Sequence, residues 1–339
     1  MLPKFSNIIL LPWLYCSLVT AQQLPSALLN RNRPLLDAHN CYPYEGKWSD
    51  RIERALGTGT PVAIEQDLAW YVDRATGKGT VVVSHKSSTD GTEPTLRKHF
   101  FERVRPMMEA ALKKNDRAAW PLITVHFDFK DNQPALLHAV WDLLGEYEGW
   151  MTTAKKRANP ADLAPFEVKP LLVLTEDSDA QEQVFFTEVP VGARLRLFGS
   201  AHTTQPKSND RNEQMHLLAT VPPAELLREK PTNYRRWWNN SWYEVEEGGQ
   251  PRAGEWTPVD AARLRALVDY AHGLGFWIRF YTLDGFHKAD DQGWGQAYNF
   301  GSPEAVHLRW KAALDAGVDL IASDQYEELA AFMRQNGFR

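Results

Sequence analysis

From Pro34 onward, apolar runs of strand length alternate with amphipathic helical patterns, and this alternation constrains the fold more than any other feature of the chain. A repeated strand-helix order is typical of a parallel sheet whose strands are joined by helices. Eight segments have the character of strands: residues 34–39, 61–68, 120–128, 169–175, 192–199, 234–242, 276–283 and 318–323. Seven segments have apolar residues at helical spacing: residues 49–57, 94–114, 132–147, 179–186, 257–274, 303–316 and 325–336. This order predicts an α/β chain that folds as a closed (β/α)8 TIM barrel.

Two parts of the chain depart from the regular order. Residues 80–84 read as an extra strand inside the second strand-helix connection. The sixth unit is poorly defined, because its strand lies among Pro, Asn and Trp residues in the segment 200–256 and its helix cannot be located there. No Pro/Ser/Gly linker interrupts the chain, so residues 22–339 are expected to form a single barrel domain.

The first 21 residues have the composition of a secretory signal peptide. Lys4 precedes an apolar run over residues 8–15, and small residues end the segment at Ala21. Cleavage after Ala21 would remove Lys4, changing the formal net charge from −5 to −6, and would leave Cys41 as the sole cysteine. We therefore expect a secreted or periplasmic chain without an intrachain disulfide and without a transmembrane segment in its mature part. The mildly acidic charge gives no reason to expect a nucleic-acid partner.

Polar residues follow four of the predicted strands. They lie in the segments Ala38-His39-Asn40, Glu65-Gln66-Asp67, Ser84-His85-Lys86 and Phe127-Asp128-Phe129-Lys130. The active site of such a barrel is built at the carboxyl ends of its strands, so these side chains are expected to meet. Together they offer a base, an acid, oxygen ligands for a cation and an extra positive charge, which is what metal-assisted attack on a phosphodiester needs.

The oxygen donors predict one divalent cation. Glu65 and Asp67 lie two residues apart and so share one strand face, Asp128 comes from the neighbouring strand, and Asn40 adds a neutral oxygen. Such a set suits Ca²⁺ or Mg²⁺, whereas zinc would prefer more His or Cys ligands. The alternative is an ordinary acidic rim paired with Lys or Arg.

Three nitrogen-bearing residues complete the predicted chemistry. His39 and His85 are candidates for the general base and the general acid of phosphoryl transfer. Lys130 should share the face of Asp128 and either reach the phosphate or tune that carboxylate, unless it is a surface lysine.

Candidates for substrate binding lie on the sixth and seventh predicted strands. Arg279 and Tyr281 form another pair two residues apart and suit a phosphate attached to a ringed or hydroxylated group, although an interior arginine paired with a barrel carboxylate explains the same pattern. Trp238 and Asn240 belong to an aromatic segment over residues 237–242. That segment would line the headgroup site or touch the surface of a lipid aggregate, or it is ordinary core packing.

These residues resemble the superfamily of phospholipase C-like phosphodiesterases, which includes phosphoinositide-specific phospholipase C, glycerophosphodiester phosphodiesterases and sphingomyelinase D. His39-Asn40 is similar to the phospholipase C form, which implies a catalytic histidine followed by a calcium-binding asparagine. Glu65 and Asp67 match the paired metal carboxylates of the superfamily, and His85 matches its second catalytic histidine.

Further motifs extend the resemblance over about residues 34–330. Phe127-Asp128-Phe129-Lys130 is similar to the Phe-Asp-Leu-Lys of sphingomyelinase D, and Arg279-x-Tyr281 resembles the Arg-x-Tyr that binds inositol phosphate in phospholipase C. Residues 174–177 lack the lysines that bind the extra ring phosphate in eukaryotic phospholipase C, so a polyphosphoinositide substrate is not implied.

The function expected from the residues and the resemblance together is a secreted, metal-dependent phosphodiesterase that cleaves a phospholipid or glycerophosphodiester headgroup. Whether it acts as a hydrolase or as a cyclising lyase stays open, because both use the same two histidines. The alternative from another class is a catalytically silent barrel that binds a phosphorylated or sugar ligand. A glycoside hydrolase, which needs two carboxylates at a sugar bond, would leave both histidines without a role.

Overall fold

Eight parallel strands close into a barrel in the computed structural model, which describes residues 34–44, 46–287 and 298–338. The strands are β1 (Leu35–Ala38), β2 (Val62–Val72), β4 (Ile123–Phe129), β7 (Leu171–Thr175), β9 (Phe198–Ser200), β10 (Arg235–Ser241), β11 (Trp277–Tyr281) and β12 (Leu320–Ser323). Closure is shown by β1, which pairs in parallel with both β12 and β2. The predicted TIM barrel is confirmed, while the predicted signal peptide lies outside the described residues.

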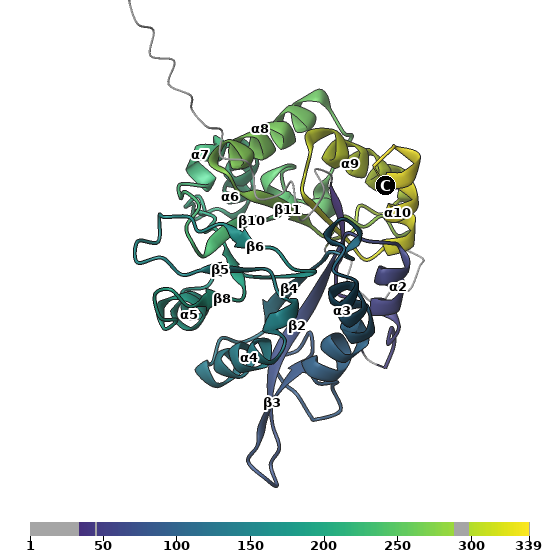
Figure 1. Cartoon of the computed structure of the whole chain (residues 1–339). Helices are drawn as coiled ribbons and strands as arrows, with labels where there is room; N and C mark the ends of the chain where they lie inside the picture. The colour runs from purple at the N-terminus through teal and green to yellow at the C-terminus, as the bar shows by residue number, and fades with distance from the viewer. Residues whose placement is uncertain (1–33, 45, 288–297, 339) are drawn as a thin grey trace, which may run out of the picture.

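Helices surround the strands (Figure 1). They include α2 (Arg51–Gly57), α3 (Glu102–Lys114), α4 (Pro134–Glu146), α5 (Asp179–Glu182), α6 (Arg211–Thr220), α7 (Pro223–Leu226), α8 (Pro258–Leu274), α9 (Pro303–Ala316) and α10 (Tyr326–Gln335). Short helical turns η1 (Arg97–Phe101) and η4 (Gln183–Thr187) adjoin α3 and α5. Gly275 and Gly317 end α8 and α9 in the left-handed conformation, which a residue without a Cβ adopts at low cost.

The extra strand predicted at residues 80–84 is β3 (Gly79–Val83). It runs antiparallel to the second half of β2, and the two form a hairpin that projects from the barrel (Figure 1). Leu68 pairs with Val83 in this ladder, so the residues that follow β3 return to the carboxyl end of the barrel. The hairpin therefore brings His85 next to Asp67, in the middle of β2.

Two predicted regions differ from the structure. The predicted strand 192–199 divides into β8 (Arg194–Leu195), which joins a small sheet with β5 (Thr153–Lys155) and β6 (Phe166–Glu167), and β9, which enters the barrel. The poorly defined segment 200–256 contains α6 and α7 before its strand. The sequence pattern does not predict α6, because only three of its ten residues are buried and its apolar stripe is weak: Met215, Leu218 and Ala219.

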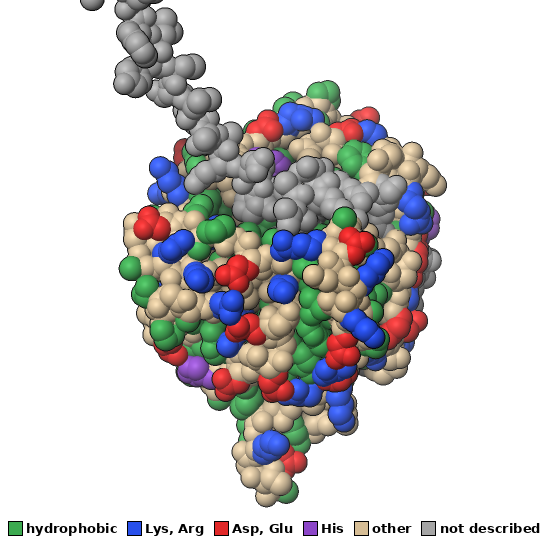
Figure 2. Space-filling view, in the orientation of Figure 1, with side chains coloured by type: hydrophobic (Ala, Val, Ile, Leu, Met, Phe, Trp, Pro, Cys, Tyr) green, Lys and Arg blue, Asp and Glu red, His purple; other side chains and the backbone are tan. Residues whose placement is uncertain are grey.

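Three further properties of the described residues bear on the sequence predictions. No helix in these ranges is long and apolar enough to cross a bilayer. Cys41 is buried as a free thiol. On the face shown in Figure 2, basic and acidic side chains are interspersed rather than gathered in one large patch of a single sign.

A buried ion pair ties the long loops at one side of the barrel to α9. Arg309 Nη2 lies 2.7 Å from Glu246 Oε1, and Arg309 Nε lies 2.9 Å from Glu246 Oε2. Trp242 Nε1 donates to the same carboxylate at 2.7 Å. Both charged side chains are at most 5% exposed, so each depends on the other for compensation of its charge.

Replacing Arg309 with methionine should therefore lower the free energy of unfolding by about 3–5 kcal/mol, because Glu246 would stay buried without its partner. Chemical denaturation monitored by circular dichroism measures this loss. The matched control is Arg54→Met, which breaks the solvent-exposed pair with Glu327 and should cost about 0–1 kcal/mol. Equal losses in the two variants would contradict the role given to burial.

Candidate active site

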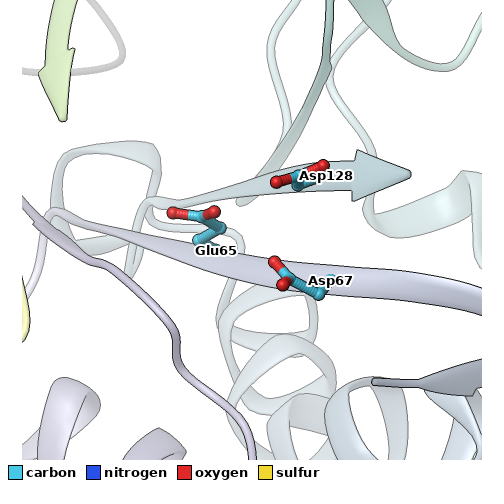
Figure 3. A group of neighbouring side chains, drawn as sticks. All are labelled: Glu65, Asp67 and Asp128. Carbon is cyan, nitrogen blue, oxygen red and sulfur yellow. The ribbon is translucent and has the colours of Figure 1, made fainter. Parts of the chain in front are cut away.

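Three carboxylates meet beside the carboxyl end of β4, where the middle of β2 contributes Glu65 and Asp67 before this strand continues into the hairpin with β3 (Figure 3). The register of the two strands places Asp67 opposite Asp128 and Glu65 opposite His126. Alternation along β2 turns Glu65 and Asp67 to the same face. One oxygen from each of Glu65, Asp67 and Asp128 lies within 4.8 Å of the others, as expected from the sequence.

The acidic cluster has the chemistry of a divalent cation site. Asp67 Oδ1 is buried without a hydrogen-bond partner. Burial, together with the negative charge of Asp67, raises the pKa of the Asp128 carboxyl to about 6. Crowded carboxylate oxygens are the ligands that Ca²⁺ and Mg²⁺ prefer. Glu65, Asp67 and Asp128 therefore fit a hard divalent cation.

Lys130 is inserted between two of these carboxylates. Its Nζ lies 2.7 Å from Asp67 Oδ2 and 2.7 Å from Asp128 Oδ2, and its side chain is 18% exposed. Burial opposes its charge, but the two carboxylates outweigh burial and raise the pKa of the Lys130 ammonium. These contacts are compatible with the tuning of a carboxylate, one of the two roles expected of Lys130 from the sequence.

This position makes Lys130 a competitor of any cation that binds Asp67 and Asp128. We expect Lys130→Met to tighten the binding of Mg²⁺ or Ca²⁺ by roughly tenfold or more, because the carboxylates lose a neighbouring positive charge. Isothermal titration calorimetry with each metal chloride measures the affinity. Lys98→Met, which removes an exposed lysine, is the matched control. Weaker cation binding by Lys130→Met would show that the ammonium supports the metal site instead.

His39 contacts the Glu65 side of the cluster. Its Nε2 lies 3.5 Å from Glu65 Oε2 and 3.2 Å from Thr282 Oγ1, and its Nδ1 lies 2.9 Å from Asp324 Oδ1. Burial lowers the pKa of the imidazole, but the charges of Glu65 and Asp324 outweigh burial and raise it to about 9. The ring is held from both nitrogens, so its orientation is set by the surrounding side chains.

His85 contacts the Asp67 side of the same cluster. Its Nδ1 lies 2.8 Å from Asp67 Oδ2, and its ring, 44% exposed, is stacked on Tyr42. The Tyr42 hydroxyl lies 2.6 Å from both Asp67 Oδ2 and Asn40 Oδ1. Tyr42 therefore links the predicted neutral ligand, Asn40, to the carboxylate cluster.

A cavity of about 490 Å³ opens over these groups. Most of the predicted catalytic and metal residues line its wall: His39, Asn40, Glu65, His85, Asp128 and Lys130. Asp67 is fully buried and contacts His85 and Lys130 of this wall. The structure thus brings together residues from positions 39 to 130 of the chain at one end of the barrel.

Arg279 lies in the barrel interior and is paired with carboxylates. Its Nε donates to Asp37, its Nη2 donates to Glu65 Oε2 at 2.7 Å, and its Nη1 donates to Asn239 Oδ1 at 3.1 Å. This is the alternative that the sequence left open, an interior arginine that orients barrel carboxylates. Tyr281 lines the cavity beside it, with the guanidinium carbon 5.7 Å from the centre of the Tyr281 ring.

Trp238 and Asn240 are core residues, which is the packing alternative that the sequence left open for their segment, and neither lines the cavity. Trp238 is fully buried, and its Nε1 donates to Thr203 Oγ1 at 2.8 Å. Asn240 is also buried and donates to the Trp238 carbonyl oxygen at 3.1 Å. Successive side chains of a strand point to opposite faces, and the residue of this segment that lines the cavity is Asn239, between the two predicted residues. The predicted contact of Trp238 with a headgroup or a lipid surface is therefore wrong.

Sequence reasoning missed several residues that complete the site. Four acidic residues contact the site or line it: Asp37, Glu176, Asp284 and Asp324. Glu176 directly follows β7, Asp284 lies just beyond β11, and Asp324 directly follows β12. The rule that functional residues follow barrel strands identifies these three. Tyr42 carries no such signal, because it reaches Asp67 from a loop.

Comparisons with known proteins found no matching family model and no matching curated protein. Among solved structures, a glycerophosphoryl diester phosphodiesterase of Parabacteroides distasonis is similar at 14% identity and TM-score 0.43, over 92% of this chain and 91% of that one. A glycerophosphodiester phosphodiesterase of the same organism is similar at 14% identity and TM-score 0.45, over 90% of this chain and 98% of that one.

A triple mutant of Plasmodium falciparum HPPK-DHPS is similar at 9% identity and TM-score 0.45, over 91% of this chain and 48% of that one. Because barrels of this architecture carry many unrelated activities, the geometry of the site, and not these similarities, supports the function proposed next.

Proposed function

We propose that the chain is a metal-dependent phosphodiesterase that cleaves a phospholipid or glycerophosphodiester headgroup. The observation that carries this proposal is the cluster of Glu65, Asp67 and Asp128 with one histidine in contact with each of two carboxylates. A cation site alone would serve a binding protein. Two imidazoles at its border supply the proton transfers that cleavage of a P–O bond requires.

In the proposed reaction the site residues divide the work. His39 takes the proton of the attacking hydroxyl in its neutral form; a cation bound to Glu65 would favour this form by offsetting the negative charge that raises the pKa of the imidazole. His85, the more exposed ring, gives a proton to the leaving oxygen. Asp324 and Asp67 orient the two imidazoles through their Nδ1 atoms. A cation held by Glu65, Asp67 and Asp128, with Asn40 as a further oxygen donor, would lower the pKa of the attacking hydroxyl and offset negative charge on the phosphate. Lys130 adds positive charge at the same place.

The identity of the attacking group decides the reaction class. If a neighbouring hydroxyl of the substrate attacks, the first product is a cyclic phosphate and the enzyme is a lyase. If water attacks, the first product is a monoester and the enzyme is a hydrolase. Phosphorus NMR of the first product distinguishes the two, because a five-membered cyclic ester has a distinct chemical shift.

The proposal extends to the compartment and the substrate. The composition of the first 21 residues supports secretion or export to a periplasm. A phospholipid or glycerophosphodiester in that compartment would be the substrate, with no nucleic acid involved.

Turnover of bis-p-nitrophenyl phosphate by the purified chain tests the activity directly, followed by a panel of phospholipids and glycerophosphodiesters assayed with Ca²⁺ and with Mg²⁺. Release of nitrophenol that stops on chelation is the expected result. If neither the generic diester nor any member of the panel is cleaved with either metal, the chain is a binding protein and the proposal is wrong.

A further inference from the structure

Glu176 is a carboxylate of the cavity that has no part in the proposed proton transfers or in the cation site. Glu176 directly follows β7 and lines the cavity together with Asn239 of β10. Its side chain is 27% exposed, so it is reachable from the cavity. Glu176 is therefore a group that a bound substrate meets.

Neighbouring side chains orient the Glu176 carboxylate but do not use all of its capacity to accept hydrogen bonds. Oε1 lies 2.6 Å from Nε2 of the buried His126, and both oxygens lie 3.2 Å from Asn239 Nδ2. A carboxylate accepts about four hydrogen bonds. The remaining capacity suits a donor, such as a hydroxyl or ammonium group, on the substrate.

The neighbouring positive charge is already neutralised. Arg279 contacts Asn239, but its guanidinium also binds the carboxylates of Asp37 and Glu65. A second phosphate on the headgroup would meet Glu176 next to an arginine that is bonded elsewhere. The negative charges of Glu176 and of the second phosphate repel each other, so such a headgroup is disfavoured.

The cavity wall next to Arg279 is aromatic. Tyr281 lies over the Arg279 guanidinium, and the rings of Tyr281 and Tyr298 meet edge to face with their centres 6.4 Å apart. This wall offers apolar contact to the short carbon chain of a small alcohol, while Glu176 offers the polar contact.

We propose that Glu176 determines substrate specificity by accepting a hydrogen bond from the headgroup. The preferred substrates are then diesters of small alcohols that carry a hydroxyl or ammonium donor, and headgroups that carry a second phosphate are rejected. This inference rests on the proposed phosphodiesterase function. The free acceptor capacity of Glu176 gains a hydrogen bond from a headgroup that carries a donor and gains none from an analogue that lacks one.

The test compares Glu176→Gln with wild type on p-nitrophenyl phosphodiesters of glycerol, ethanolamine, ethanol and glycerol phosphate. We expect the variant to lower kcat/KM for the glycerol and ethanolamine esters by roughly tenfold and to change the ethyl ester by less than about twofold. The glycerol phosphate ester should improve, because the variant removes a repelling charge. The glycerol and ethanolamine arms separate hydroxyl recognition from ammonium recognition.

Glu188→Gln is the matched control, because Glu188 forms a similar pair with His138, at 2.8 Å, outside this cavity. It should leave all four esters unchanged. An equal fall for all esters in Glu176→Gln, the ethyl ester included, would show that Glu176 only positions Asn239 and Arg279, and would overturn the inference.

Binding provides a second measurement that does not depend on turnover. By calorimetry, glycerol phosphate and phosphoethanolamine should bind the wild type more tightly than ethyl phosphate, and Glu176→Gln should remove this preference. Equal affinities for the three monoesters in the wild type would overturn the inference. Loss of turnover with this preference intact would instead contradict the proposed phosphodiesterase function alone.

Discussion

Replacing His39 with alanine is expected to lower kcat on a phosphodiester by about 10²–10⁴-fold, the range typical of a lost general acid or base. His39 Nε2 faces Glu65 and Thr282, and Asp324 holds its Nδ1. The variant removes the group that takes the proton while leaving the three carboxylates in place. Steady-state kinetics with bis-p-nitrophenyl phosphate, together with circular dichroism to verify folding, measure the effect.

The separate roles of the two histidines can be resolved with leaving groups of different basicity. Loss of a general acid matters less when the leaving group departs readily as an anion, so His85→Ala should be milder for a nitrophenyl ester than for an alkyl ester. His39→Ala should affect both esters equally. His216→Ala, which removes a histidine that is 58% exposed and paired with Glu247, is the control and should retain full activity. Activity near wild type in His39→Ala or in His85→Ala would contradict the assignment of His39 as the general base and His85 as the general acid.

Loss of the cation should reduce activity by a comparable factor. Asp67 is fully buried, one of its oxygens has no hydrogen-bond partner, and the other meets His85, Lys130 and Tyr42. Asp67→Asn removes one negative charge from the cluster, and we expect kcat/KM to fall by about 10²-fold or more, since metal catalysis contributes several kcal/mol. Chelation of the wild type should give the same loss, reversed by Ca²⁺ or Mg²⁺.

Thermal unfolding provides a readout of the cation that is independent of activity. A ligand present at 100 times its Kd stabilises the folded state by about 2.7 kcal/mol, so the metal should raise the Tm of the wild type and not that of Asp67→Asn. Asp210→Asn, which changes the capping carboxylate of α6, serves as a control that should keep the metal-dependent shift. A wild-type Tm that changes with neither Ca²⁺ nor Mg²⁺ would contradict the cation site.

The predictable part of the site consists of residues that end strands. The sequence predicts Glu65, Asp67 and Asp128, because a spacing of two places side chains on one face and because neighbouring parallel strands bring their carboxyl-terminal parts together. The same reasoning fails at β10, where it favours Trp238 and Asn240 although Asn239 lines the cavity. In a strand without a clear apolar-polar alternation, the sequence does not say which parity faces the barrel axis.

The amino-acid sequence by itself determined the barrel and its closely spaced acidic residues, because strand-helix alternation and a period of two are local properties. It also placed the histidines at strand ends. The tertiary structure alone decided which charges on different strands neutralise each other: Lys130 with Asp67, and Arg279 with Asp37 and Glu65. Those pairs join strands that are up to 242 residues apart in the sequence, and their partners are selected by barrel closure and register, which no local pattern encodes.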